Sequence, residues 1–203
     1  MFEGFASGEL ILEERAARRG ARRLRGRFPY NKAAVLSDGG RTGRPRKEVI
    51  APRAFAYRVE KPDEDIHLLI GHSYDRPLAS RGAGTLDLQD SDEALTFTAT
   101  ITEEMQEVSY VRDFLATSQA GLVMGVSPGF RIPPERAVPK AEEVTEEDPS
   151  LGMALIRTIF AALLYELSIV TRPAYPEAQV EARSWEATSG GLTIPKRGAY
   201  RWR

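Results

Sequence analysis

The stretch that most constrains the fold is ALTFTATI, residues 94–101, in which apolar and polar side chains alternate from Leu95 onward. Its four odd-numbered apolar side chains would share one face of a strand, with threonines on the other, which is typical of a half-buried β-strand. A second alternating piece, TLDL at 85–88, precedes it, and the polar QDSDE between them predicts a hairpin loop. Strands joined by a hairpin favour an antiparallel sheet or barrel over a doubly wound fold.

The period then changes to that of a helix. The segment TEEMQEVSYVRDFLATSQAG, residues 102–121, opens with Thr102 as an N-cap and ends at Gly121, a common helix terminator. Its apolar residues form a stripe at helical spacing: Met105, Val108, Val111, Phe114 and Leu115. We therefore predict one amphipathic helix over residues 102–121.

Two later segments are less regular. Residues 131–150 are rich in proline and acid, and we expect a long, mobile surface loop there. Residues 154–171, ALIRTIFAALLYELSIVT, are densely apolar. They fit either one buried helix or two buried strands separated near Ala161 and Ala162.

Composition excludes several kinds of site. The 203 residues include no cysteine and only two histidines, so disulfides, thiolate metal sites, cysteine nucleophiles and histidine-rich metal sites are excluded. No glycine-rich phosphate loop follows a strand. We therefore expect no cofactor and no metal. Neither a membrane-spanning apolar run nor a secretory signal is present, so a soluble intracellular protein is expected.

The charges are sorted along the chain, although the net charge is only −1. Residues 15–27 hold seven arginines, and residues 142–148 hold five acids. The basic run could bind nucleic acid through phosphate contacts. A solvated face or arm is the favoured interpretation, because no aromatic residues are interleaved with the arginines to stack on bases.

One hydroxyl interrupts the apolar run GLVMGVSPGF, residues 121–130. Ser127 is followed at once by Pro128 and Gly129, so it is either a turn residue or a nucleophile held beside flexible glycines. A serine nucleophile needs a base, and only His67 and His72 can supply one.

The strand predicted in DIHLLIGHSYDRPLAS, residues 65–80, would aim the two histidines at opposite faces. His72 would share a face with Ile66, Leu68 and Ile70, and it would end the strand beside a turn, where a side chain can reach a cleft. We therefore favour His72 as the base. The alternative is that His72 caps the strand and bonds to a backbone carbonyl.

A catalytic histidine also needs a third group that orients it, and Glu166 is the candidate for that group. It lies in AALLYELSIV, which is otherwise apolar apart from Ser168, and a carboxylate is costly to bury there without a partner such as histidine. The alternative is an edge strand on which Glu166 faces water.

Four stretches, in this order, resemble the prohead (capsid maturation) proteases of tailed phages, which share the fold of herpesvirus assemblin. They are EVIAPRAFA, HLLIGHSYDRPLAS with His72, AGLVMGVSPGF with Ser127, and LYELSIVTRPAYPEAQV with Glu166, and together they span residues 48–180. The chain departs from the family pattern at Pro128, where many members carry an aromatic residue. It also departs at Glu166, because assemblin-type enzymes use a second histidine as third member.

The resemblance implies a β-rich α+β fold, a closed and mostly antiparallel β-barrel surrounded by helices, and it favours strands over residues 154–171. It implies a serine endopeptidase with Ser127 as nucleophile, His72 as base and Glu166 as orienting acid. Arg172 is either a helper at the oxyanion or a solvated surface residue, which we favour. The implied substrates are the scaffold and the major capsid protein, cleaved inside the immature capsid in the host cytoplasm, with self-cleavage as well.

The expected organisation has three parts: a basic N-terminal arm at 1–27, a protease domain at 28–184 with its mobile acidic loop at 131–150, and a flexible C-terminal tail at 185–203. The tail is a reasonable site for self-cleavage. A homo-oligomer is compatible with the sequence, whereas a membrane partner is not expected. The alternative function is a non-enzymatic capsid assembly or scaffold-interaction protein, and a nucleic-acid binder ranks last.

Overall fold

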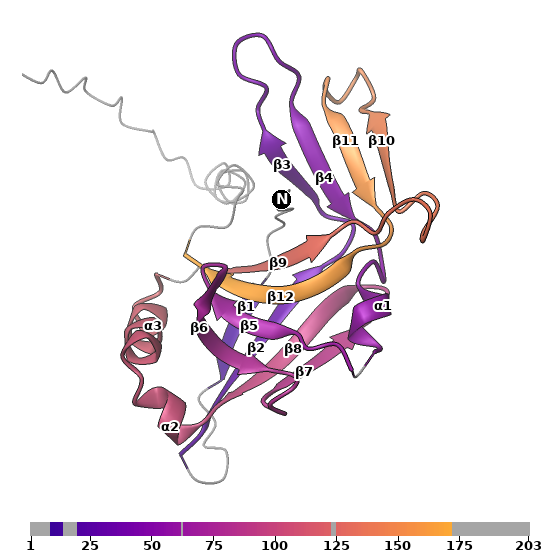
Figure 1. Cartoon of the computed structure of the whole chain (residues 1–203). Coiled ribbons are helices and arrows are strands. Elements are labelled where there is room, and N and C mark those ends of the chain that lie inside the picture. The colour runs from indigo at the N-terminus through magenta and orange to yellow at the C-terminus, as the bar shows by residue number, and fades with distance from the viewer. Residues whose placement is uncertain (1–8, 14–19, 62, 123–124, 172–203) are drawn as a thin grey trace, which may run out of the picture.

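The computed structural model describes residues 9–13, 20–61, 63–122 and 125–171. In these ranges the chain forms three four-stranded sheets and three short helices (Figure 1). We call them the hairpin sheet (β1-β2-β8-β7), the site sheet (β6-β5-β12-β9) and the projecting sheet (β10-β11-β4-β3). The strands are β1 Glu9–Glu13, β2 Arg22–Pro29, β3 Ala33–Ser37, β4 Arg46–Ile50, β5 His67–Ile70, β6 Ser73–Ser80, β7 Leu86–Asp90, β8 Ala94–Ile101, β9 Gly125–Arg131, β10 Glu142–Glu146, β11 Leu155–Ile159 and β12 Leu163–Val170. The helices are α1 Ala56–Val59, α2 Glu103–Gln106 and α3 Ser109–Gln119.

The predicted hairpin is confirmed. Strands β7 and β8 pair antiparallel, with Leu86 opposite Ala99. The four apolar side chains of β8 are buried, and its threonines are half-buried on the other face: Leu95, Phe97, Ala99 and Ile101 against Thr96, Thr98 and Thr100. The alternation in this stretch therefore reports the core face correctly.

Strand β2 occupies the second half of the arginine run. Arg23, Arg25 and Arg27 are exposed, while Leu24 and Phe28 are buried on the opposite face. Gly26 lies opposite Phe97 in the ladder, and a side chain at Gly26 would overlap the Phe97 ring. This half of the run thus lies on the solvated face of a strand, whose buried face contributes to the core.

The hydrophobic core lies between the hairpin sheet and the site sheet. One cluster of buried side chains includes Leu24, Phe28 and Leu95 from the former and Leu68 and Leu164 from the latter. Helix α3 adds Val111 and Phe114 to the same cluster. The site sheet consequently has one face in this core, while Ser127, Glu166 and Ser168 are buried on its other face.

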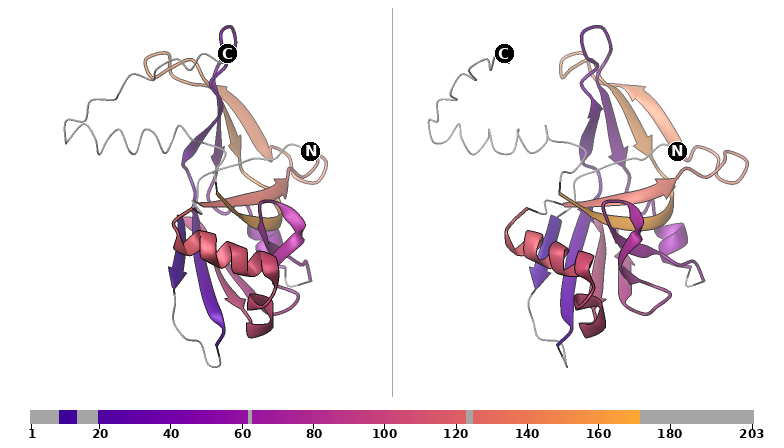
Figure 2. Two further views of the ribbon diagram at one scale, coloured as in Figure 1. Left: turned by 90° about the vertical axis from the view of Figure 1, so that its left-hand side faces the viewer. Right: turned by 60° about the vertical axis from the view of Figure 1, so that its left-hand side comes forward.

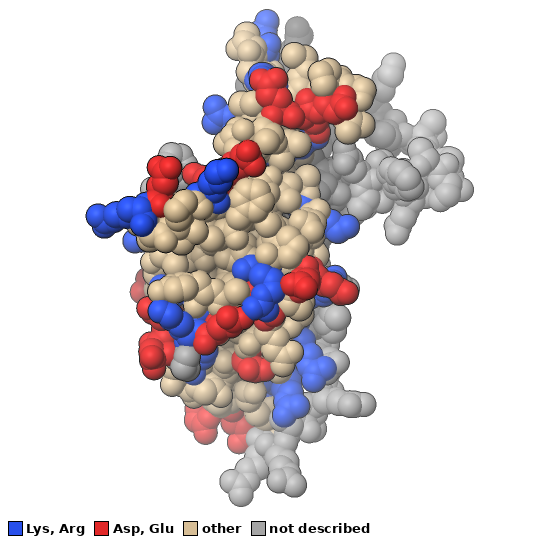
Figure 3. All heavy atoms as spheres, turned by 90° about the vertical axis from the view of Figure 1, so that its right-hand side faces the viewer, with Lys and Arg blue, Asp and Glu red and all other residues tan. Residues whose placement is uncertain are grey.

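The segment 154–171 forms two strands, β11 and β12, separated at residues 160–162, as the resemblance favoured. Strand β11 belongs to the projecting sheet, where it pairs parallel with β4 and antiparallel with β10. This sheet extends away from the rest of the molecule in every view (Figures 1 and 2). Every residue of β10 is exposed, and acidic side chains gather at this end of the molecule (Figure 3).

The helix predicted over residues 102–121 is interrupted. Thr102 caps α2 by accepting from the Met105 N–H, but Val108 is extended and α3 begins after it. The apolar stripe still packs on the core as expected. At the far end, Gly121 has a φ of 70°, and the Leu122 N–H donates to the Thr117 carbonyl oxygen at 2.9 Å, which is a Schellman motif.

The expected closed β-barrel surrounded by helices is wrong. Strand β9 passes close to β1 and β2, and β6 passes close to β8, but no ladder joins the sheets among the described strands. Pro128 lies in β9, an edge strand of its sheet, where a residue without a backbone N–H is tolerated. The sheets therefore remain open, and the described helices are too short to surround them.

Parts of the predicted organisation can be located. Strand β1 and most of β2 fall within residues 1–27, and β10 falls within residues 131–150. The tail at 185–203 lies outside the described residues. No helix in the described part of the chain combines the length and apolar character needed to cross a bilayer.

Candidate active site

His72 lies in a tight turn, not at the end of a strand. Strand β5 ends at Ile70, and β6 begins at Ser73, which pairs with Ile70. Gly71 and His72 have φ angles of 61° and 59°, and positive values at both central residues are typical of a type I′ hairpin turn. The prediction that His72 shares a strand face with Leu68 and Ile70 is therefore wrong, because the chain has already turned.

The turn brings His72 to Glu166. The imidazole Nδ1 lies 2.7 Å from Glu166 Oε1, and the side chains are 20% and 6% exposed. Ser168 links the pair a second time: its Oγ accepts from the His72 backbone N–H at 2.9 Å and donates to Glu166 Oε2 at 2.7 Å. Both carboxylate oxygens are thus engaged, which compensates for the cost of burying this charge.

Glu166 reaches this position through a bulge and a glycine. The ladder between β12 and β9 shifts between Leu164 and Glu166, leaving Tyr165 as the extra residue. Such a bulge re-aims side chains, so Leu164 joins the core while Glu166 faces the other way. Gly129 lies opposite Glu166, and a Cβ at Gly129 would overlap Oε1 and lie 2.7 Å from the carboxylate carbon. The carboxylate therefore occupies space that only glycine leaves open.

Ser127 lies inside strand β9, which excludes the turn interpretation. It is the direct partner of Ser168 in the ladder, and directly opposed side chains have Cβ atoms about 4.5–5.5 Å apart. Ser127 is 1% exposed, and its Oγ has no hydrogen-bond partner among the described residues. A buried hydroxyl without a partner is uncommon and calls for an explanation.

The three predicted residues therefore surround Ser168. Ser127 lies opposite it on β9, Glu166 lies two residues before it on β12, and His72 donates to it from the turn after β5. With Nδ1 directed at the carboxylate, the buried Nε2 is on the opposite edge of the ring. In serine hydrolases an imidazole held by an acid through Nδ1 uses Nε2 to exchange the serine proton, but no hydrogen bond joins Nε2 to Ser127 Oγ in this structure.

His67 lies beside this group on β5, but its side chain makes other contacts. Its ring packs edge-on against Tyr74 at a centroid distance of 5.8 Å, and its Nε2 lies 3.5 Å from Asp65 Oδ2. His67 is nevertheless the ladder partner of Glu166 in the pairing of β5 with β12, whereas the hydrogen-bond contact to the Glu166 carboxylate comes from His72.

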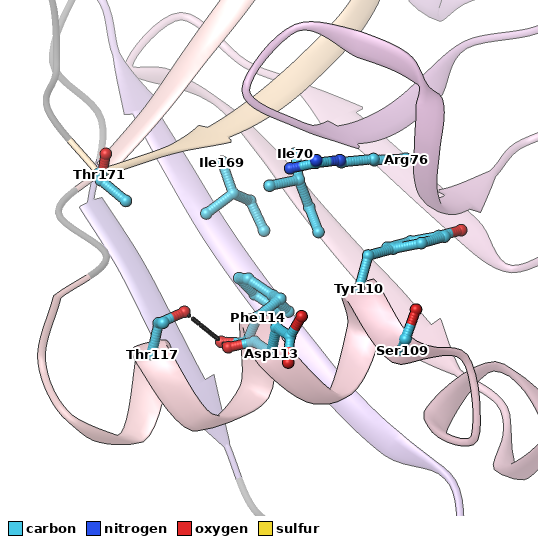
Figure 4. Close-up of a pocket in the computed structure, with 9 residues that line it drawn as sticks. All are labelled: Ile70, Arg76, Ser109, Tyr110, Asp113, Phe114, Thr117, Ile169 and Thr171. Atoms are coloured by element: carbon cyan, nitrogen blue, oxygen red, sulfur yellow. Dashed lines mark hydrogen bonds between the residues drawn. The ribbon is translucent and has the colours of Figure 1, made fainter.

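A cavity of about 340 Å³ lies beside α3, between the helix and the ends of β5, β6 and β12 (Figure 4). Figure 4 shows Arg76 extending over Ile70 on one side and Tyr110 and Asp113 rising from α3 on the other. None of the three candidate residues lines it. Its β12 residue Ile169 belongs to the core, so the cavity lies behind the candidate site, and we do not assign the chemistry to it.

Sequence reasoning missed two parts of the site. Ser168 was noted beside Glu166, but its link to His72 depends on the turn at residues 71–72. The sequence indicates only that Gly129 adds flexibility beside Ser127, whereas in the structure Gly129 makes room for the Glu166 carboxylate. Arg172, the suggested oxyanion helper, lies outside the described residues. No cluster of three potential metal ligands is found in the part of the chain that the structure describes.

A serine, a histidine and a carboxylate gathered on one sheet are the groups that serine hydrolases use. Comparison with protein families identifies the class more closely: the model of the caudovirus prohead serine protease matches residues 34–190. The chain belongs to this family, and membership gives it the role of a phage prohead protease in capsid maturation. Searches of curated proteins and of solved structures found no significant match.

Proposed function

We propose that the protein is a serine endopeptidase whose triad is Ser127, His72 and Glu166. Ser127 Oγ attacks the substrate carbonyl, His72 Nε2 accepts its proton and later returns it to the leaving amine, and Glu166 holds the imidazole tautomer and stabilises its charged form. Ser168 is a positioning residue, because it fixes the His72 backbone and the second carboxylate oxygen without reaching the substrate.

The observation that carries this proposal is the 2.7 Å contact between His72 Nδ1 and Glu166 Oε1, on the strand that pairs with Ser127. The hydroxyl of Ser127 supports it, since leaving a buried hydroxyl unpaired costs about 1–3 kcal/mol and a nucleophile is one reason to retain it. Because Ser127 is only 1% exposed, neighbouring groups must move before a substrate carbonyl reaches it.

The substrates that we propose are the scaffold and the major capsid protein, together with the protease itself. The family role in the prohead supports the first two. The self-cleavage site that we predicted, in the tail at 185–203, stays a prediction.

The test is co-expression of the protease with the capsid and scaffold proteins of the same phage. We expect Ser127→Ala to fold normally and to leave both proteins uncleaved, because the attacking oxygen is gone. Ser118→Ala on α3 is the matched control and should process them at the wild-type rate. Normal processing by Ser127→Ala would rule out the assignment of the nucleophile.

A further inference from the structure

Arg131 ends the strand that carries Ser127 and lies on the same face. Residues 127, 129 and 131 alternate onto this face of β9, and Arg131 is exposed. Four residues of extended chain separate Arg131 from Ser127, which corresponds to about 13 Å at the rise of a β-strand. A peptide lying along this face with its scissile bond at Ser127 would therefore pass Arg131.

Arg131 lies over an aromatic ring. Its guanidinium carbon lies 5.3 Å from the centroid of Tyr165, the bulge residue of β12. The same ring lies 4.3 Å from the guanidinium of Arg58, which is buried and pairs with Glu64 at 2.6 Å. Arg58 Nε is buried without a hydrogen-bond partner among the described residues. Arg131 thus lies on a ring that is itself held in place.

The charges around this ring leave Arg131 available to an external anion. Arg58 is neutralised by Glu64, and Glu166 is engaged by His72 and Ser168, whereas Arg131 has no ion pair within the described part of the chain. Burial raises the pKa of the Tyr74 phenol, Glu166 raises it further, and Arg58 and Arg131 oppose that rise. Both arginines therefore act on the same region as the catalytic carboxylate.

We propose that Arg131, seated on Tyr165, is a specificity-determining residue that binds a carboxylate side chain of the peptide substrate, three or four residues from the scissile bond. The inference rests on the proposed function. A guanidinium held over an aromatic ring loses part of its freedom before it binds a carboxylate, and its planar fork can form two parallel hydrogen bonds to that carboxylate. Aspartate or glutamate at this position should therefore accelerate cleavage.

The experiment uses the full chain and a library of peptides made by digesting a bacterial proteome, with cleaved ends identified by mass spectrometry. We expect the wild-type protein to select Asp or Glu at the third or fourth residue from the cleaved bond, on one side only. For one selected peptide, Arg131→Gln should lower kcat/KM about ten- to a hundredfold, as loss of a hydrogen bond between charged groups does. Changing that acid to its amide should lower wild-type kcat/KM equally and should have little further effect in Arg131→Gln.

Two controls separate recognition from damage. Arg112→Gln removes an exposed arginine from α3 and should keep the acidic preference. Labelling by a fluorophosphonate, which needs no peptide contact at Arg131, should proceed at the wild-type rate in Arg131→Gln. Cleavage without acidic preference, or a preference that survives Arg131→Gln, overturns the subsite alone. A wild-type protein that cleaves nothing in the library contradicts the proposed function, and this inference with it.

Discussion

Gly129 gives the sharpest test of how the candidate site is built. Its φ is not in the left-handed region, so the backbone accepts alanine without strain. The added Cβ would overlap Glu166 Oε1 and lie 2.7 Å from Cδ and 2.9 Å from Cγ. Since carbon atoms pack at about 3.5–4.0 Å, the carboxylate must retreat by about 1 Å. That shift breaks the 2.7 Å contact with His72 or the 2.7 Å bond from Ser168.

The expected loss in Gly129→Ala is large for activity and moderate for stability. A misplacement of about 1 Å costs about 10²-fold in rate, and complete loss of the triad acid costs up to about 10⁴-fold. We therefore expect fluorophosphonate labelling to slow by a factor within that range. Unfolding should become easier by about 1–3 kcal/mol, because overpacking and the lost hydrogen bond of the buried carboxylate both contribute.

The assay is the second-order rate of fluorophosphonate labelling, with urea unfolding measured in parallel. Gly26→Ala is the control: it inserts the same methyl against Phe97 in the hairpin sheet, so it should lose stability while the folded protein labels normally. If Gly129→Ala acts through Glu166, the double variant with Glu166→Ala should label no more slowly than Glu166→Ala alone. Wild-type labelling by Gly129→Ala, or effects that multiply in the double variant, would refute this reasoning.

Two further predictions concern the site and the stability of the fold. Ser168→Ala removes the hydrogen-bond partner of the His72 N–H and of one Glu166 oxygen. Unfolding should therefore become easier by about 1–3 kcal/mol, and fluorophosphonate labelling should slow about tenfold. Ser168→Thr should restore part of the stability and part of the labelling rate. Burial raises the pKa of Asp90, whose Oδ1 accepts a hydrogen bond from Tyr30 Oη at 2.6 Å. The protonated Asp90 carboxyl therefore contributes its full share of the folding stability below the unfolded Asp pKa of about 3.9. That contribution is lost as the pH rises through the raised pKa of the folded state. Asp90→Asn should therefore match the wild type near pH 4 and exceed it progressively toward pH 8 in urea unfolding, and equal losses in both proteins would contradict the sign.

The local alternation of the sequence predicted strands β7 and β8, each of which buries apolar side chains on one face. The stretch 94–101 reports its faces directly, because every second side chain enters the core. Strand β2 was missed although Leu24 and Phe28 alternate with arginines, because Gly26 contributes no apolar side chain and the charges dominate the segment. The packing of the Phe97 ring over Gly26 is a tertiary fact that no local pattern encodes.

The residues proposed for the candidate site came from their chemistry, which did not give their geometry. The chemical argument, a serine that needs a base and a buried carboxylate that needs a partner, selected Ser127, His72 and Glu166. The contact between His72 and Glu166 depends on a two-residue turn with positive φ, and the orientation of Glu166 depends on the bulge at Tyr165. Both break the strand alternation on which the face assignments relied. Closure of the sheets into a barrel likewise depends on contacts between edge strands that are far apart in the sequence. The local pattern does not encode these contacts, and the expected barrel is wrong.

The most direct measurement is the identity of the residue that an active-site phosphonate modifies. The protein is incubated with the probe, digested, and the adduct is located by mass spectrometry in the wild type and in His72→Ala. Our account predicts a single adduct on Ser127 that is greatly reduced when the imidazole is absent. An adduct on another serine, or one on Ser127 that forms equally fast without His72, would contradict the assignment.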